Sequence, residues 1–196
     1  MKKQLNEMTN SELGELFPII ISDPDPGWAG IFEDEKEKII SSLGKQKILS
    51  IEHIGSTAVP FLKAKPTIDI LIEVPASFNK EEFIKKITAL GYYYTSKPEN
   101  PAPHMMFMKG YSINGFVGQA FHVHVRYKGD WDEIYFRDFM RVHPEAAKEY
   151  EELKLRLSEQ YRNDREEYTN QKSDFIKRVT QVARSSKTDK SAHSTV

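Results

Sequence analysis

The chain has 196 residues, of which 39% are hydrophobic and 29% are charged, a balance typical of a soluble globular protein. Its 28 basic and 29 acidic residues give a net charge of −1, which does not favour nucleic acid as a partner, and the lack of cysteine excludes disulfides and thiolate chemistry. No apolar run approaches the roughly 20 residues of a membrane helix, and the first lysines are not followed by the apolar core of a signal peptide. We therefore expect a cytoplasmic protein that does not engage a membrane.

The first half of the chain is predicted to alternate strands and helices. Apolar residues at helical spacing before Gly44 indicate a helix that ends at this glycine. Asn79 and Glu82 match a capping box at the start of a second helix. In order, the predicted elements are a strand at 17–22, a helix at about 28–43, strands at 47–56 and 67–74, and a helix from Asn79 to Gly91.

The second half is predicted to change from strands to helices after Gly129. Asn114-Gly115 is a hairpin-turn pair between two β-like runs, and Asp130 with Glu133 suggests a capping box. The polar, small-residue-rich end of the chain suggests disorder. The predicted elements are strands at 92–96, 104–110 and 121–127, a helix that begins after Asp130, helices at about Pro144–Tyr161 and Asp164–Arg184, and a disordered tail at 185–196.

This order of elements predicts an α+β protein, because strands cluster in the middle of the chain and helices at its end. We expect residues 1–129 to form a core with a small mixed β-sheet flanked by helices. Residues 130–184 should form a helical segment that packs on this core and closes one wall of its site. The apolar stripe of these helices needs such a partner surface, since isolated helices of this length are marginal.

One stretch carries most of the functional information, 53-HIGSTAVPFLKAKPTIDILIEV-74. Gly55-Ser56 ends one apolar run, and glycine lets a backbone approach a ligand while serine offers a hydroxyl and an N–H to phosphate. Asp69 follows within the next apolar run, two positions after Thr67. A hydroxyl-bearing turn and a carboxylate at the same end of neighbouring strands are what a metal-bound triphosphate needs.

The stretch resembles the nucleotidyltransferase superfamily pattern of a Gly-Ser turn followed by an acid-bearing strand, and it is more closely similar to the GrpB-like family. The resemblance covers about residues 17–183. This chain has Pro60-Phe61-Leu62 where the family usually has Pro-Gly-Leu. The matching segments are Glu52–Pro60, Ala64–Pro66, Ile68–Ile70, Asp25–Trp28, Phe121–His124, Phe136–Phe139, Tyr150, Leu153-Lys154, Tyr168 and Lys172.

The resemblance implies a nucleotidyltransferase-like fold and a cleft that takes a nucleotide triphosphate with a divalent metal. Such transfer typically uses two or three carboxylates to hold Mg²⁺, but here Thr67 precedes Asp69 and the later strand carries His122 and His124. An Asp–His set suits Zn²⁺ or Mn²⁺ better than Mg²⁺. We expect Asp69 and Ser56 in catalysis, Asp69, His122 and His124 at the metal, and Gly55, Ser56, Lys65, Arg137, Lys154 and Lys172 on phosphate.

Two functions are compatible with these residues. One is an enzyme that transfers a nucleotidyl or phosphoryl group to an acceptor that the sequence does not identify. The other is a catalytically degenerate module that binds a nucleotide or another phosphorylated or anionic small molecule. Structural roles also remain open: Asp69 as a buried acid satisfied by Ser56, the two histidines as hydrogen-bonded pocket residues, and the helical cations as surface ion pairs.

Overall fold

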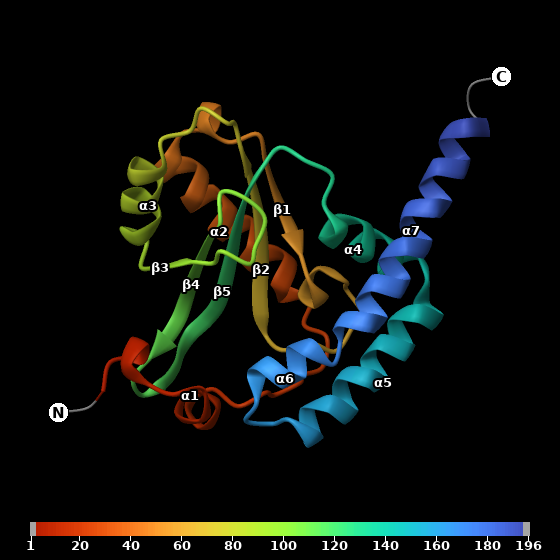
Figure 1. Ribbon diagram of the computed structural model, residues 1–196, viewed down its shortest axis with the longest axis horizontal. Coiled ribbons are helices and arrows are strands. Elements are labelled where there is room, and N and C mark those ends of the chain that lie inside the picture. Colours follow the sequence, from red (N-terminus) through yellow and green to blue (C-terminus); the bar gives the residue numbers. More distant parts are fainter. Residues whose placement is uncertain (1–2, 194–196) are drawn as a thin grey trace.

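A five-stranded mixed sheet forms the centre of the computed structural model, which describes residues 3–193 (Figure 1). The strand order is β1-β2-β5-β4-β3; β2 and β5 run parallel, and the other neighbouring pairs are antiparallel. This confirms the predicted α+β class and the small mixed sheet. The strands are β1 (Ser50–Ile54), β2 (Thr67–Val74), β3 (Tyr93–Ser96), β4 (Met105–Ser112) and β5 (Gly115–Tyr127).

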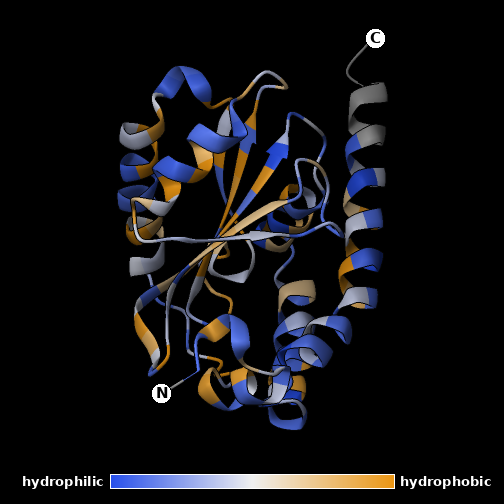
Figure 2. Ribbon diagram, turned by 60° about the vertical axis from the view of Figure 1, so that its left-hand side comes forward, coloured by the Kyte–Doolittle hydropathy of each residue, from blue (hydrophilic) through white to orange (hydrophobic). Residues whose placement is uncertain are grey.

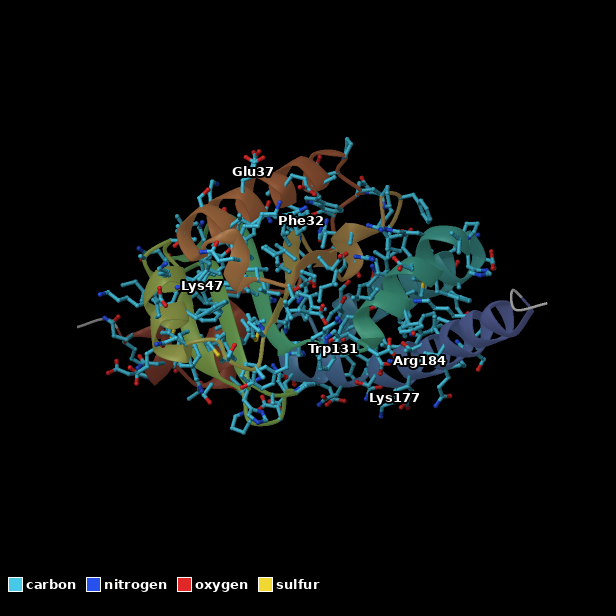
Figure 3. All side chains as sticks on the ribbon, turned by 90° about the horizontal axis from the view of Figure 1, so that it is seen from above. Phe32, Glu37, Lys47, Trp131, Lys177 and Arg184 are labelled. Carbon is cyan, nitrogen blue, oxygen red and sulfur yellow. The ribbon has the colours of Figure 1, made fainter. Side chains whose placement is uncertain are left out.

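One face of the sheet is apolar and is covered by α2 (Gly27–Leu43) and α3 (Lys80–Thr88). Alternate residues of β2 and β5 point to this face, as the period of a strand requires. Figure 3 shows Phe32 of α2 directed towards the sheet and Glu37 directed away from it. The main core is built from these side chains, among them Phe32, Ile39, Ile68, Ile70, Ile72, Phe83, Phe107, Val123 and Val125.

The other face carries the polar residues of the same strands and is approached by the C-terminal helices. These are α4 (Asp132–Val142), α5 (Pro144–Gln160), α6 (Arg165–Asn170) and α7 (Ser173–His193). Their apolar stripes form a second core with Val59 and Leu62, which follow β1. Figure 2 shows the apolar strands at the centre of the molecule and mostly hydrophilic surfaces on the helices around them. The helical segment thus packs on the core, as expected from its stripe.

Several element ends follow directly from local chemistry. The side chain of Asn79 accepts a hydrogen bond from the backbone N–H of Glu82 at the start of α3. Gly44 ends α2 at φ +90°, where a side chain would be strained. Pro144 occupies the first turn of α5, where its missing N–H costs nothing. The β4–β5 hairpin forms as predicted, but Ser112 pairs with Gly115, so the turn residues are Ile113-Asn114 and not Asn114-Gly115.

Other expectations were wrong. Residues 17–22 are not a strand of the sheet, because their backbone bonds with Ala64 and Arg162 outside it. Trp131 precedes α4 without a side-chain cap, so the capping box expected there does not form. The last predicted helix is divided into α6 and α7, and α7 continues to His193 where a disordered tail was expected. Residues 194–196 lie outside the described residues.

Short elements fill the N-terminal region and the loops: 3-10 turns η1 (Leu5–Glu7), η2 (Lys45–Lys47) and η3 (Ser56–Ala58), and helix α1 (Asn10–Leu16). Helix α1 begins with Thr9 and Glu12 in a reciprocal capping box. In Figure 1 α1 and α6 lie near each other at the bottom of the view. Within the part of the chain that the structure describes, no helix is long and apolar enough to cross a membrane.

Candidate functional site

The Gly55-Ser56 turn lies directly against Asp69. Gly55 has φ +70°, and a Cβ atom at this position would be 2.5 Å from Oδ2 of Asp69. A side chain would therefore be strained by its backbone conformation and would also collide with the carboxylate. The glycine is explained by this close approach, which brings the end of β1 and the turn η3 to the acid on β2.

Asp69 is the first member of a hydrogen-bonded chain that crosses three strands. The parallel register of β2 and β5 sets Asp69 opposite His122, and Nδ1 of His122 lies 3.2 Å from Oδ1 of Asp69. The other ring nitrogen of His122, Nε2, lies 2.7 Å from the hydroxyl of Tyr111 on β4. The rings of Tyr111 and His122 are also stacked, with an interplanar angle of 10°. The imidazole is therefore held on both sides and in one orientation.

Asp69 is ionised in this setting. Burial raises the pKa of its carboxyl, but the hydrogen bond from His122 and the charges of neighbouring groups, Lys65 included, lower it more. The net result is a pKa below the ordinary value of an aspartate. Because the Asp69 side chain is still 28% exposed, the charge faces an opening and is not sealed in the core.

Three cations from distant parts of the sequence lie near one another here: Lys65 and Lys172 interact with the charge of Asp69, and Arg165 interacts with both lysines. Lys65 precedes β2, Arg165 begins α6, and Lys172 lies between α6 and α7. The Nζ atoms of both lysines lie over the ring of Tyr168, at 5.6 Å for Lys65 and 4.2 Å for Lys172. All three cations are partly exposed. They form what we call the cation cluster, Lys65, Arg165 and Lys172.

The members of the cation cluster repel one another. Burial and, to a smaller extent, the charges of Arg165 and Lys172 lower the pKa of Lys65 to about 7, while the charge of Asp69 acts in the opposite direction. Burial likewise lowers the pKa of Lys172 to about 8, with Asp69 raising it and Arg165 lowering it. One carboxylate is thus too little negative charge for three cations in this pocket.

Ser56 completes one side of the pocket together with Tyr150 of α5. The Tyr150 hydroxyl hydrogen-bonds with Ser56, and burial together with the charge of Asp69 raises the pKa of this phenol. The structure therefore brings Gly55, Ser56, Lys65, Asp69 and His122 close together around one partly exposed carboxylate. His124 projects from the same face as His122, two register positions further along the β2–β5 ladder, where it is opposite Leu71.

The predicted metal centre is not formed by these residues. Among residues 3–193, no group of three His, Asp or Glu side chains is arranged to hold a metal ion. Both ring nitrogens of His122 already have partners, and Nδ1 of His124 is buried without one. The donors left at the cleft, one paired carboxylate and one buried imidazole, do not fit a resident divalent cation.

Two predicted phosphate ligands have structural roles. Arg137 is 8% exposed and donates to Glu52 Oε2 at 2.7 Å, to the backbone oxygen of His53 at 2.9 Å and to Asp138 at 2.8 Å. It ties α4 to β1. Lys154 is 2% exposed and donates from Nζ to the backbone oxygen of Lys63, above the ring of Tyr150. These donors are already in use, so the two residues are not counted in the cation cluster.

Arg165 and Tyr111 were missed by reasoning from the sequence. Arg165 follows Asp164, whose side chain caps α6, and it looks like an ordinary first-turn residue. Tyr111 lies just beyond the predicted strand at 104–110. The predicted hairpin could have suggested that Tyr111 pairs with Phe116, but only the fold shows that Tyr111 contacts His122 beside Asp69.

A cavity of about 730 Å³ adjoins the cleft at Arg165. Its walls come from α1, from the end of α5 and from the start of α6, and include Asn10, Arg162 and Glu166. Asp69, Lys65 and His122 are not part of its lining. We therefore place the candidate site at the charged groups around Asp69 and not in this cavity.

The comparisons with known proteins agree on one family. The family model described as GrpB protein matches residues 18–182. A UPF0157 protein of Pseudomonas aeruginosa is 40% identical over 157 residues, covering 79% of this chain and 63% of that protein, so the chain spans less than two thirds of that relative. The glutamate-rich protein GrpB of Alkalihalophilus pseudofirmus is 34% identical over 165 residues, covering 82% of this chain and 93% of that protein.

The chain is also similar to a solved structure and to a more distant relative. The crystal structure of GrpB from Enterococcus faecalis has a TM-score of 0.73 and 28% sequence identity, covering 84% of this chain and 96% of that one. A dephospho-CoA kinase of Mycolicibacterium paratuberculosis is 24% identical over 75% of this chain, but the match covers 41% of the kinase. With the family model covering most of its length, this chain is a member of the GrpB protein family.

Proposed function

We propose that this protein binds a phosphorylated, anionic small molecule, such as a nucleoside triphosphate, in the cleft beside Asp69. The observation that carries the proposal is the cation cluster, in which Lys65, Arg165 and Lys172 lie close enough to repel one another and the carboxylate of Asp69 acts against that repulsion at both lysines. That carboxylate is itself engaged by His122. Cations that repel one another in a partly exposed pocket are stabilised by an anion that binds among them.

The turn at Gly55 and the residues around it suit the same ligand. Glycine permits a ligand to approach the backbone closely, and the hydroxyls of Ser56 and Tyr150 can donate to phosphate oxygens. Lysine and arginine are the usual partners of phosphate groups. No resident metal is needed in this proposal, because the cation cluster supplies the positive charge.

The test is isothermal titration of ATP and of inorganic tripolyphosphate, with and without a metal chelator. Lys172→Met should weaken both ligands on the order of tenfold or more, since it removes a charge-assisted contact worth about 1.5–3 kcal/mol. The matched control is Lys177→Met, because Lys177 lies on the exposed side of α7 (Figure 3). Equal affinities for Lys172→Met and Lys177→Met would contradict the proposal.

The direction in which Asp69→Asn changes the affinity for tripolyphosphate distinguishes a metal-dependent site from a metal-free one. In a site where Asp69 holds a metal that bridges to phosphate, this change removes the ligand's anchor and affinity falls. In the cation cluster it removes a negative charge next to the phosphates, so affinity should rise or stay the same. Two results together would overturn the metal-free proposal. Asp69→Asn would bind tripolyphosphate more weakly than the wild type, and added divalent metal would raise the affinity of the wild type but not that of Asp69→Asn.

A second candidate function is transfer of a nucleotidyl or phosphoryl group, as the resemblance to the nucleotidyltransferase superfamily implies. One observation favours it: the chain Asp69–His122–Tyr111 orients an imidazole in the way that a general base is usually oriented. Turnover of ATP in the presence of candidate acceptors tests it. Dephospho-CoA belongs among the compounds screened, given the likeness to a dephospho-CoA kinase. If the protein is such an enzyme, His122→Gln should abolish turnover while ATP still binds. If the wild type binds ATP without any turnover, the transferase function is excluded and the binding function is retained.

A further inference from the structure

An aromatic cluster lies at the edge of the cleft and has no role in binding phosphate. Phe17, Tyr111 and Phe116 contact one another in pairs, with ring centroids 5.0–5.4 Å apart. Phe17 follows α1, and the two others face each other across the β4–β5 hairpin. We call these three residues the aromatic rim.

The aromatic rim is continuous with the cation cluster through Arg165. Nη1 of Arg165 donates to the backbone oxygen of Phe17 at 2.9 Å, and its guanidinium lies 5.9 Å from the ring centroid of Tyr111. Tyr111 also bonds to His122, which bonds to Asp69. A ligand whose phosphates contact Arg165 therefore has an aromatic surface beside it.

The rim is not an ordinary part of the core. Phe17 is 3% exposed, as a core residue would be, but Phe116 is 44% exposed and Val117 next to it is 62% exposed. A phenylalanine on the surface usually needs no explanation when it stands alone. This one contacts two aromatic neighbours, Phe17 and Tyr111, which both contact Arg165 of the cation cluster, and its remaining surface is open.

We propose that Phe116 is a stacking surface for the aromatic base of a nucleotide whose phosphates lie on the cation cluster. This proposal rests on the proposed function and narrows its ligand to a nucleotide, as opposed to a sugar phosphate or inorganic phosphate. The site then has the two ends that such a ligand requires, a cationic pocket and an apolar ring face. Aromatic side chains accept any base by stacking, so the rim by itself selects for a base but not for which base.

The experiment compares ATP with inorganic tripolyphosphate in the wild type and in Phe116→Ala, by isothermal titration of the full chain. The wild type should bind ATP more tightly than tripolyphosphate. Phe116→Ala should weaken ATP about tenfold, which corresponds to the loss of one base–aromatic stack, and leave tripolyphosphate unchanged. Phe116→Trp should restore ATP binding, because the indole offers at least as large a stacking surface.

Val117→Ala is the matched control, since Val117 is adjacent and exposed but has no ring. It should change neither affinity. If Phe116→Ala left ATP affinity unchanged, or weakened both ligands equally, the stacking role would be overturned while phosphate binding stood. If the wild type bound neither ligand, the proposed function itself would fail and the rim proposal with it. Unchanged tripolyphosphate binding also shows that Phe116→Ala is folded.

Discussion

The two faces of the central sheet differ sharply although the same strands build them. On β2, Ile68, Ile70 and Ile72 point to the side of α2 and are fully buried, while Thr67 and Asp69 point to the C-terminal helices. On β5, Val123 and Val125 share the first face and His122 and His124 the second. Period-two alternation thus separates a dry core from a polar cleft by a single residue step.

Under the proposed function, stability and binding are divided between the two faces. The apolar face holds the fold together by burial, and each of its side chains is replaceable only at the cost of a cavity. The polar face is less well satisfied, with mutually repelling cations and an unpartnered buried Nδ1 on His124. Functional sites commonly retain such local conflicts, because a ligand resolves them.

The largest effect should come from neighbouring residues on opposite faces of β2. Ile70→Ala should lower the free energy of unfolding by about 2–5 kcal/mol, because it leaves a cavity in the main core. Asp69→Asn is similar in size to the wild-type residue and should change stability far less. Urea denaturation of both variants checks this. Equal destabilisation by the two changes would mean that the faces do not divide these roles.

Arg137 provides the next test, because the structure removes it from the phosphate ligands. Arg137→Met should lower the free energy of unfolding by about 2–4 kcal/mol, since it leaves the oxygens of His53 and Glu52 without their donor. Tripolyphosphate affinity should be unchanged. Arg178→Met is the control, because its ion pair with Glu149 is exposed and should contribute about 0–1 kcal/mol. If Arg137→Met lost tripolyphosphate binding but kept its stability, Arg137 would be a phosphate ligand after all.

Acid should destabilise the protein through His53 on the apolar side. His53 stacks on Phe32 and hydrogen-bonds to Thr57, and burial lowers its pKa to about 4. Its ordinary pKa is 6.5, so the unfolded chain binds the proton more readily. Stability should therefore fall as pH drops from about 6.5 to 4, on the order of 2 kcal/mol for this residue.

The check is the melting temperature from pH 7 to pH 4 for the wild type, His53→Gln and a control at the partly exposed His143. Removing His53 should flatten the acid side of the profile, and His143→Gln should not. His124, whose pKa burial also lowers to about 4, adds to the same loss, so some acid sensitivity should remain in His53→Gln. An unchanged slope in His53→Gln would show that this ring does not titrate with unfolding.

The smallest effect should appear on the alkaline side, from the cation cluster. The pKa of Lys172, lowered by burial to about 8, lies below the ordinary lysine value of 10.5, so the unfolded chain binds more protons between these values. Stability of the free protein should therefore rise slightly as pH increases through about 8. Tripolyphosphate affinity should fall over the same range, since the ligand needs the charged amine. Titrations at pH 7 and pH 9 should show this fall in the wild type and in Lys177→Met, and a smaller one in Lys172→Met.

Much of the fold could be predicted because its signals are local. The alternation in residues 67–74, the Asn79 cap and Gly44 each report a backbone requirement within a few residues. The failures were also physical in origin. Residues 17–22 have the apolar run of a strand, but whether such a run joins a sheet depends on a partner distant in the sequence. The Asp130 carboxylate, predicted to cap α4, pairs instead with Arg184 of α7.

The sequence by itself determined that Gly55, Ser56 and Asp69 belong together and that the two histidines share one strand face. It did so because a tight turn and strand alternation are set by nearest neighbours. Only the tertiary structure decided which cations join Asp69. Lys172 interacts with Asp69 and Arg165 with Lys65 and Lys172, although α6 and α7 lie about a hundred residues from β2 in the sequence, while Arg137 is paired with Glu52 and Lys154 with a backbone carbonyl. Competition among partners far apart in the sequence has no local signature, since it is resolved by the packing of whole helices.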